Sequence, residues 1–222
     1  MPAKKVTVGI EVTPKKAFAS ALEWPGWTRA GKTPEDALEA LAACALRYAK
    51  VAKRAKLDFP FDDDVSFDVV EEAEGNATTA FGAPDVRFDA DHRRTTARDG
   101  ERLAAIVAAS YAIFDAIVAT APPTLRKGPR GGGRDRDRIV EHLVGSDGGY
   151  ARVLGLKSTE VDPRNGDAVA ELRERMLAPI SAPSDGSPIA GRKWPPRYAA
   201  RRVAWHALDH AWEIEDRSEP SG

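Results

Sequence analysis

The chain has 222 residues, of which 42% are hydrophobic and 30% are charged, and its 33 basic residues nearly balance its 34 acidic ones. This composition is ordinary for a globular protein, and a net charge of -1 gives no overall attraction to nucleic acid or to an anionic membrane. A single cysteine, Cys44, excludes an internal disulfide, and the first residues, MPAKKVTVGIEV, lack the apolar stretch of a signal peptide. We therefore expect a cytoplasmic protein.

The first part of the chain predicts a small unit of strands and one helix. Apolar residues alternate with polar or small ones over residues 6–12, which indicates a half-buried strand, and the segment AFASALEW (17–24) reads as its hairpin partner. Thr33 is a good N-cap for a helix over residues 34–56, because proline and acidic residues follow it. A further strand is expected over residues 65–72.

These elements resemble the HicB-like fold. The resemblance rests on the hairpin, on the stretch LEWPGWTRAGKTPEDALEALAACALRYA and on the strand after it. It implies a ββαβ unit over residues 1–73. HicB proteins are antitoxins, but folds are reused for many purposes, so antitoxin activity does not follow from the likeness.

The remainder of the chain predicts helices. Residues 74–98 have weak periodicity and read as a connection, and residues 218–222 as a tail. Between them we expect four helices, over residues 99–120, 134–154, 164–178 and 196–216. Four helices of this length favour a four-helix bundle, so the predicted fold class is α+β.

One of these helices is apolar enough to raise the question of a membrane. The segment LAAIVAASYAIFDAIVATA (103–121) carries a single charge, Asp115, and is nearly long enough to span a bilayer. Its many alanines are only modestly hydrophobic, and Asp115 would cost roughly 2.5–3.5 kcal/mol in lipid. Its larger apolar residues recur every three or four positions. We therefore predict a buried bundle helix and no membrane partner.

Three of the four histidines form a pattern typical of a metal site. His206 and His210 lie four residues apart, so a helix presents both on one face, although the glutamate of a HExxH motif is absent. His142 lies on the apolar face of the second bundle helix. Three inward-facing imidazoles are costly to bury without a shared partner, which favours a metal. His92 is expected to be a solvated surface residue.

The segments HLVGSDGGYARVLG and HALDHAWEIEDR resemble the DinB-like superfamily of four-helix bundles, which includes bacillithiol- and mycothiol-dependent S-transferases. The resemblance covers residues 99–217. In that superfamily one histidine of the second helix and an HxxxH pair of the last helix bind the metal, which implies His142, His206 and His210 here. It also implies a low-molecular-weight thiol as a cosubstrate.

Three histidine ligands leave a fourth tetrahedral position open, as in catalytic zinc sites, and nickel also suits such a ligand set. A metal there lowers the pKa of a bound water or thiol, so a hydrolase and a thiol transferase both remain open. Carboxylates usually orient such histidines, and the candidates are Asp209, Glu213 and Asp115.

Two further features qualify this interpretation. The basic segment RKGPRGGGRDRDR (126–138) offers an anion site at Arg126, Lys127, Arg130 and Arg134, although a solvated linker is the simpler interpretation and nucleic acid is not favoured. The alternative function is a non-catalytic interaction or regulatory protein that binds a partner through the HicB-like unit. A small-molecule substrate and a homodimer are both compatible with the sequence.

Overall fold

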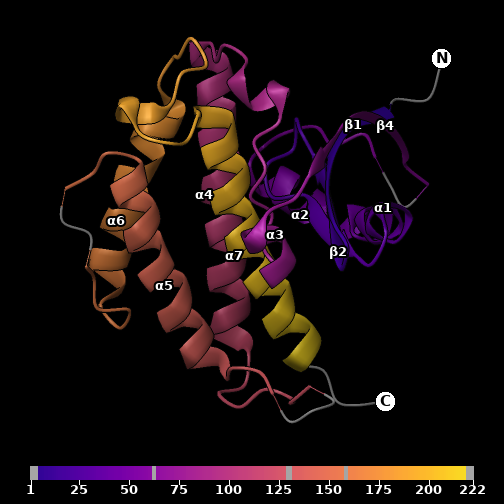
Figure 1. The fold of residues 1–222 in the computed structure, drawn as a ribbon. Helices are drawn as coiled ribbons and strands as arrows, with labels where there is room; N and C mark the ends of the chain where they lie inside the picture. Colours follow the sequence, from indigo (N-terminus) through magenta and orange to yellow (C-terminus); the bar gives the residue numbers. More distant parts are fainter. Residues whose placement is uncertain (1–4, 62–63, 129–131, 158–159, 219–222) are drawn as a thin grey trace.

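The computed structural model describes residues 5–61, 64–128, 132–157 and 160–218, and it confirms the predicted α+β class. A four-stranded sheet and two helices form one side of the molecule, and four long helices form the other (Figure 1). The strands are β1 (Lys5–Thr13), β2 (Lys16–Ala21), β3 (Thr28–Gly31) and β4 (Ser66–Glu74). The long helices are α4 (Ala97–Thr120), α5 (Arg136–Val153), α6 (Gly166–Ser181) and α7 (Pro196–Ser218).

The sheet has the strand order β3-β2-β1-β4, with β1 antiparallel to β2 and parallel to β4. The strand β3 is absent from the predicted ββαβ order, which therefore lacks one strand of the sheet. β3 pairs with β2 because the turn after Trp24 reverses the chain, and this turn is closed by the backbone hydrogen bond from Trp27 to Trp24.

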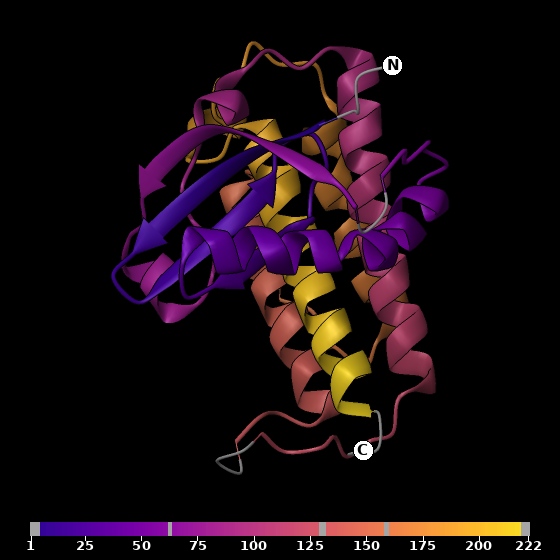
Figure 2. The same cartoon turned by 90° about the vertical axis from the view of Figure 1, so that its right-hand side faces the viewer.

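The single helix predicted over residues 34–56 is two helices, α1 (Pro34–Ala43) and α2 (Ala45–Arg54), which lie across the sheet (Figure 2). Thr33 caps α1 as predicted, and its hydroxyl accepts a hydrogen bond from the backbone of Asp36. The break falls at Cys44. After it Tyr48 stacks on Trp27 with ring centroids 5.5 Å apart, so packing against the sheet determines the direction of α2.

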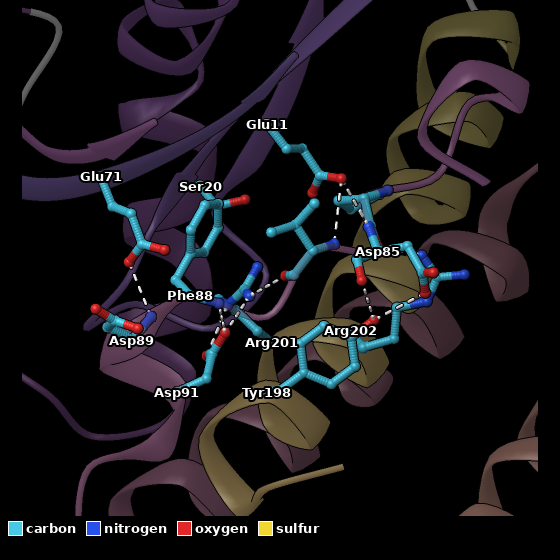
Figure 3. A network of polar contacts seen from close by, with 12 residues as sticks. Glu11, Ser20, Glu71, Asp85, Phe88, Asp89, Asp91, Tyr198, Arg201 and Arg202 are labelled. Atoms are coloured by element: carbon cyan, nitrogen blue, oxygen red, sulfur yellow. Dashed lines mark hydrogen bonds and ion pairs between the residues drawn. The ribbon is translucent and has the colours of Figure 1, made fainter. Parts of the chain in front are cut away.

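The predicted connection, residues 74–98, contains the helix α3 (Ala77–Phe81) and a short 3-10 helix, η1 (Asp89–His92). It also carries a buried polar network that joins β1 to α7 (Figure 3). Oε2 of Glu11 accepts hydrogen bonds from the Thr79 hydroxyl at 2.6 Å and from the Asp85 backbone at 2.9 Å. On the other side of the connection, Arg201 of α7 donates to Asp91. The segment therefore fixes the sheet to the bundle.

The two parts of the molecule share a hydrophobic core. Side chains of α4 and α7 enter the same buried cluster as the sheet and the helices α1 and α2; they are Ile106, Ala109, Leu208 and Trp212. Across the same contact, Phe18 of β2 meets the ring of Trp205 edge to face, with centroids 6.2 Å apart. The predicted boundary thus divides the sequence into two parts, but the hydrophobic core is continuous across it.

Helix α4 is long and apolar enough to cross a membrane by length and composition, with a mean hydropathy of 1.9 over its most apolar window. In the fold it packs against α7 and α6, and Ile106, Val107 and Phe114 are buried there. Thr96 caps it through Asp99 in a capping box. Of this apolar stretch, 39% is buried, so α4 is a partly buried helix of the bundle.

Candidate metal centre

Helices α5 and α7 bring three histidine side chains together. Nε2 of His142 lies 3.3 Å from Nε2 of His206, and one ligand atom from each of His142, His206 and His210 lies within 4.8 Å of the other two. The ring centroids are 4.8 to 5.2 Å apart. The three residues are thus close enough to hold one metal ion.

The local sequence explains this convergence. Residues four apart share one face of a helix, so α7 presents His206 and His210 together. Both are buried, with exposed fractions of 6% and 8%, because α7 is the central helix of the fold and is covered on most sides. His142 is only half buried, so the cluster opens toward solvent beside α5.

The surroundings keep two of the imidazoles neutral. Burial lowers the pKa of His206 well below its ordinary value, and the neighbouring His210 and His142 lower it further. Burial and His210 also lower the pKa of His142. Neutral imidazole has a free nitrogen lone pair, which a metal ligand needs. Nδ1 of His206 is buried and has no hydrogen-bond partner among the described residues.

Glu213, one of the three predicted orienting carboxylates, contacts the cluster. Its Oε2 lies 2.9 Å from Nδ1 of His210, and its Oε1 accepts a hydrogen bond from Arg217 at 2.6 Å. Burial alone would raise the pKa of Glu213, but the hydrogen bonds from His210 and Arg217 lower it below its ordinary value. The ionised carboxylate favours a proton on Nδ1 of His210, which leaves Nε2 as the ligand atom.

The other two carboxylates lie elsewhere. Asp115 accepts two hydrogen bonds from Arg173 of α6, at 2.8 and 3.0 Å, and among the described residues it contacts this arginine rather than a histidine. Its position on α4 directs it to the neighbouring helix α6. Asp209 pairs with Arg29 of β3 at 3.6 Å, so it joins α7 to the sheet. The prediction that these two orient the histidines is therefore corrected, because helix packing turns both toward other partners.

The basic segment before α5 does not form one anion site among its described residues. Arg126 donates to the backbone of Asp216 at 2.8 Å, and Lys127 pairs with Asp135 at 2.6 Å. Both cations therefore already have partners at the end of α7 and the start of α5. Arg130 lies outside the described residues. Arg134 is exposed and close enough to the histidines to lower the pKa of His142 and His206.

Aromatic side chains flank the cluster. The ring of Tyr150 lies 5.6 Å from that of His206, and Trp194 lies 5.1 Å from Tyr150. Trp205 is stacked on His206 with centroids 6.0 Å apart. Tyr150 and Trp205 therefore contribute to the burial of His206.

A second polar group in the bundle was not anticipated from the sequence. Asp147 of α5 is 1% exposed and lies between Tyr111 of α4 and Arg173 of α6. The signal that was available is its position within α5, where it follows Leu143 and Val144 on the buried face.

Comparison with protein-family models, with curated proteins and with solved structures finds no match to this chain. Function must therefore be argued from the site.

Proposed function

We propose that this chain is a DinB-like metal-binding protein in which His142, His206 and His210 hold one divalent cation, zinc or nickel. The observation that carries the proposal is the 3.3 Å separation between Nε2 of His142 and Nε2 of His206. In a tetrahedral site with Zn–N bonds of roughly 2.0–2.1 Å, two ligand nitrogens lie about 3.3 Å apart. The lowered pKa values of these two imidazoles support the same assignment, since both rings are neutral at pH 7.

Three protein ligands leave room for a further ligand, which is the pattern of a catalytic site. A cation bound there supplies Lewis-acid chemistry, because it lowers the pKa of a water or thiol at the open position. The protein's own contributions are the orientation of His210 by Glu213 and a wall formed by Tyr150 and Trp194. Together with the DinB-like sequence features, this favours transfer of a low-molecular-weight thiol such as mycothiol to an electrophile.

Elemental analysis tests the metal. We expect about one equivalent of zinc or nickel per chain after reconstitution and dialysis, and less than about a tenth of that in His142→Ala and His206→Ala, because two nitrogens do not hold the ion against dialysis. The matched control is His92→Ala, which changes an exposed histidine outside the cluster and should keep the full equivalent. A wild-type protein that stays metal-free would overturn the proposal.

The reaction is tested separately, with the reconstituted protein, mycothiol and a fluorogenic electrophile. Thiol conjugation that follows metal content across the three histidine variants supports the transferase. A protein that holds metal but gives no conjugation above the His206→Ala background would retain the metal site and reject this chemistry.

A further inference from the structure

A cavity of about 420 Å³ lies between α4, α5 and α6, outside the histidine cluster. Val140 and Val144 of α5 line it. Each stands two positions from His142, and residues two apart on a helix point in nearly opposite directions. The cavity therefore lies on the far side of α5 from the metal centre, and nothing in the proposed function uses it. Its volume falls in the range of small-molecule sites, roughly 300–1,000 Å³.

The walls of this cavity are mainly apolar. They come from three helices, which supply Phe114, Val118, Val140, Val144, Val169 and Leu177. Ala108 and Ala112 also line the cavity from α4, and their small side chains leave part of this space unfilled. An apolar molecule entering it would bury surface that now contacts solvent.

One end of the cavity carries charged groups. Arg173 lines it with a side chain only 10% exposed, and its guanidinium lies over the ring of Tyr111, 4.3 Å from the centroid. Nε of Arg173 and Oδ2 of Asp147 are 3.5 Å apart, and within the described part of the chain neither atom has a hydrogen-bond partner. NH1 of Arg173 donates hydrogen bonds to both carboxylate oxygens of Asp115. The cation is thus already engaged.

Carboxylates outnumber cations around this space. Asp115 and Glu174 line the cavity at its exposed side, and Asp147 lies behind it, against the single guanidinium of Arg173. An anionic ligand would meet these carboxylates and would have to displace one of them from Arg173. A protonated amine meets an excess of negative charge, and Asp115 keeps lone pairs to accept its hydrogen bonds.

We propose that this cavity binds a small hydrophobic amine, with its apolar body between α4, α5 and α6 and its ammonium group between Asp115 and Glu174. The inference is independent of the metal centre. It assigns the molecule a second small-molecule site, selected by the charge of the cavity rim and by the volume that the alanines of α4 leave open.

Isothermal titration with three matched probes tests this assignment: 3-phenylpropylamine, 3-phenylpropanol and 3-phenylpropionate. We expect saturable binding of one amine per chain, at least about tenfold tighter than the alcohol, and no measurable binding of the carboxylate. Ala112→Leu fills the cavity and should abolish amine binding. Asp115→Asn removes a negative charge beside Arg173 and should weaken amine binding at least about tenfold.

Two controls separate this site from the rest of the surface. Glu171→Gln removes an exposed acid from α6 that does not line the cavity, and it should leave the affinity unchanged. His206→Ala should also keep amine binding, since it alters only the metal centre. No saturable binding of the amine, equal binding of the carboxylate, or binding that survives both Ala112→Leu and Asp115→Asn would each overturn the proposal.

Discussion

Glu213 connects His210 to Arg217 on a single helical face, so its carboxylate controls how that imidazole is presented. Removing it in Glu213→Ala should lower metal affinity about 10- to 100-fold, because the ring loses both its orientation and the negative charge behind it. Chelator competition measures the change. The metal affinity of Glu213→Gln should lie between those of wild type and Glu213→Ala, since an amide oxygen accepts the hydrogen bond but carries no charge.

Glu215→Ala is the matched control for that experiment. Glu215 lies two positions along the same helix but pairs with Arg47 of α2, away from the histidines. Equal affinity in Glu213→Ala and Glu215→Ala would show that Glu213 does not act on the metal centre.

Asp147 should make stability depend on pH. Burial raises its pKa from an ordinary value of 3.8 to about 6, against the opposing effects of Arg173 and the Tyr111 hydroxyl, and Asp115 adds to the increase. The folded state therefore binds a proton that the unfolded chain has released between about pH 4 and pH 6. Its contribution to stability is fully present below pH 4 and is lost as pH rises through 6, a change of about 3 kcal/mol.

Urea unfolding of Asp147→Asn between pH 4.5 and 8 measures this contribution. The amide does not titrate, so the difference between wild type and variant should move in favour of the variant as pH rises. Glu171→Gln, an exposed acid on α6, should give no such trend. Parallel profiles for wild type and Asp147→Asn would contradict the assigned pKa.

At the scale of the elements, replacing each of two helical glycines by alanine should change the stability of the protein in opposite directions. A Cβ on Gly100, in the first turn of α4, would lie 2.1 Å from the carbonyl oxygen of Ser181 at the end of α6. A Cβ on Gly145, in the exposed face of α5, would meet nothing within 4 Å. Gly100→Ala should therefore lower the free energy of unfolding by about 1–3 kcal/mol, whereas Gly145→Ala should raise it by about 0.5–1 kcal/mol.

Thermal and urea unfolding of the two alanine variants provide the measurement, and each serves as the other's control because the substitution is identical. If Gly100→Ala leaves the free energy of unfolding unchanged, the backbone of α4 at Gly100 is not in close contact with Ser181 at the end of α6. Destabilisation in both variants would argue against the open face of α5.

At the scale of the whole molecule, the buried pair of Asp91 and Arg201 joins the segment after the sheet to α7. Both side chains are 3% exposed. Asp91→Ala leaves an uncompensated guanidinium in the interior and should lower the free energy of unfolding by about 3–5 kcal/mol. Asp162→Ala breaks an exposed pair with Arg164 and should change it by less than about 1 kcal/mol.

Urea unfolding followed by tryptophan fluorescence separates these expectations. The sheet and the bundle share one core, so the loss in Asp91→Ala should appear in a single cooperative transition. Two resolved transitions would show that the two parts unfold independently, contrary to the packing of Leu208 and Trp212 against the sheet side.

The elements that the sequence predicted best are those that rest on local physics. The cap at Thr33, the alternation in β1 and the three- and four-residue periodicity of the bundle helices depend on neighbouring residues alone. The pairing of His206 with His210 is of the same kind, because helix geometry places residues four apart side by side. The sequence by itself therefore determined the fold class, and it led to the hypothesis that three histidines converge.

Other features depend on contacts between residues far apart in the chain. The break at Cys44, the network around Glu11 and the partners of Asp115 and Asp209 were decided by which helix or strand lies opposite, and no spacing in the sequence encodes that. The same holds for the cavity behind α5, which lies where α4, α5 and α6 meet and is lined by two small residues of α4, Ala108 and Ala112. Local conformations follow from neighbouring residues, whereas tertiary packing decided which charges meet, because burial and distance set the strength of every polar contact.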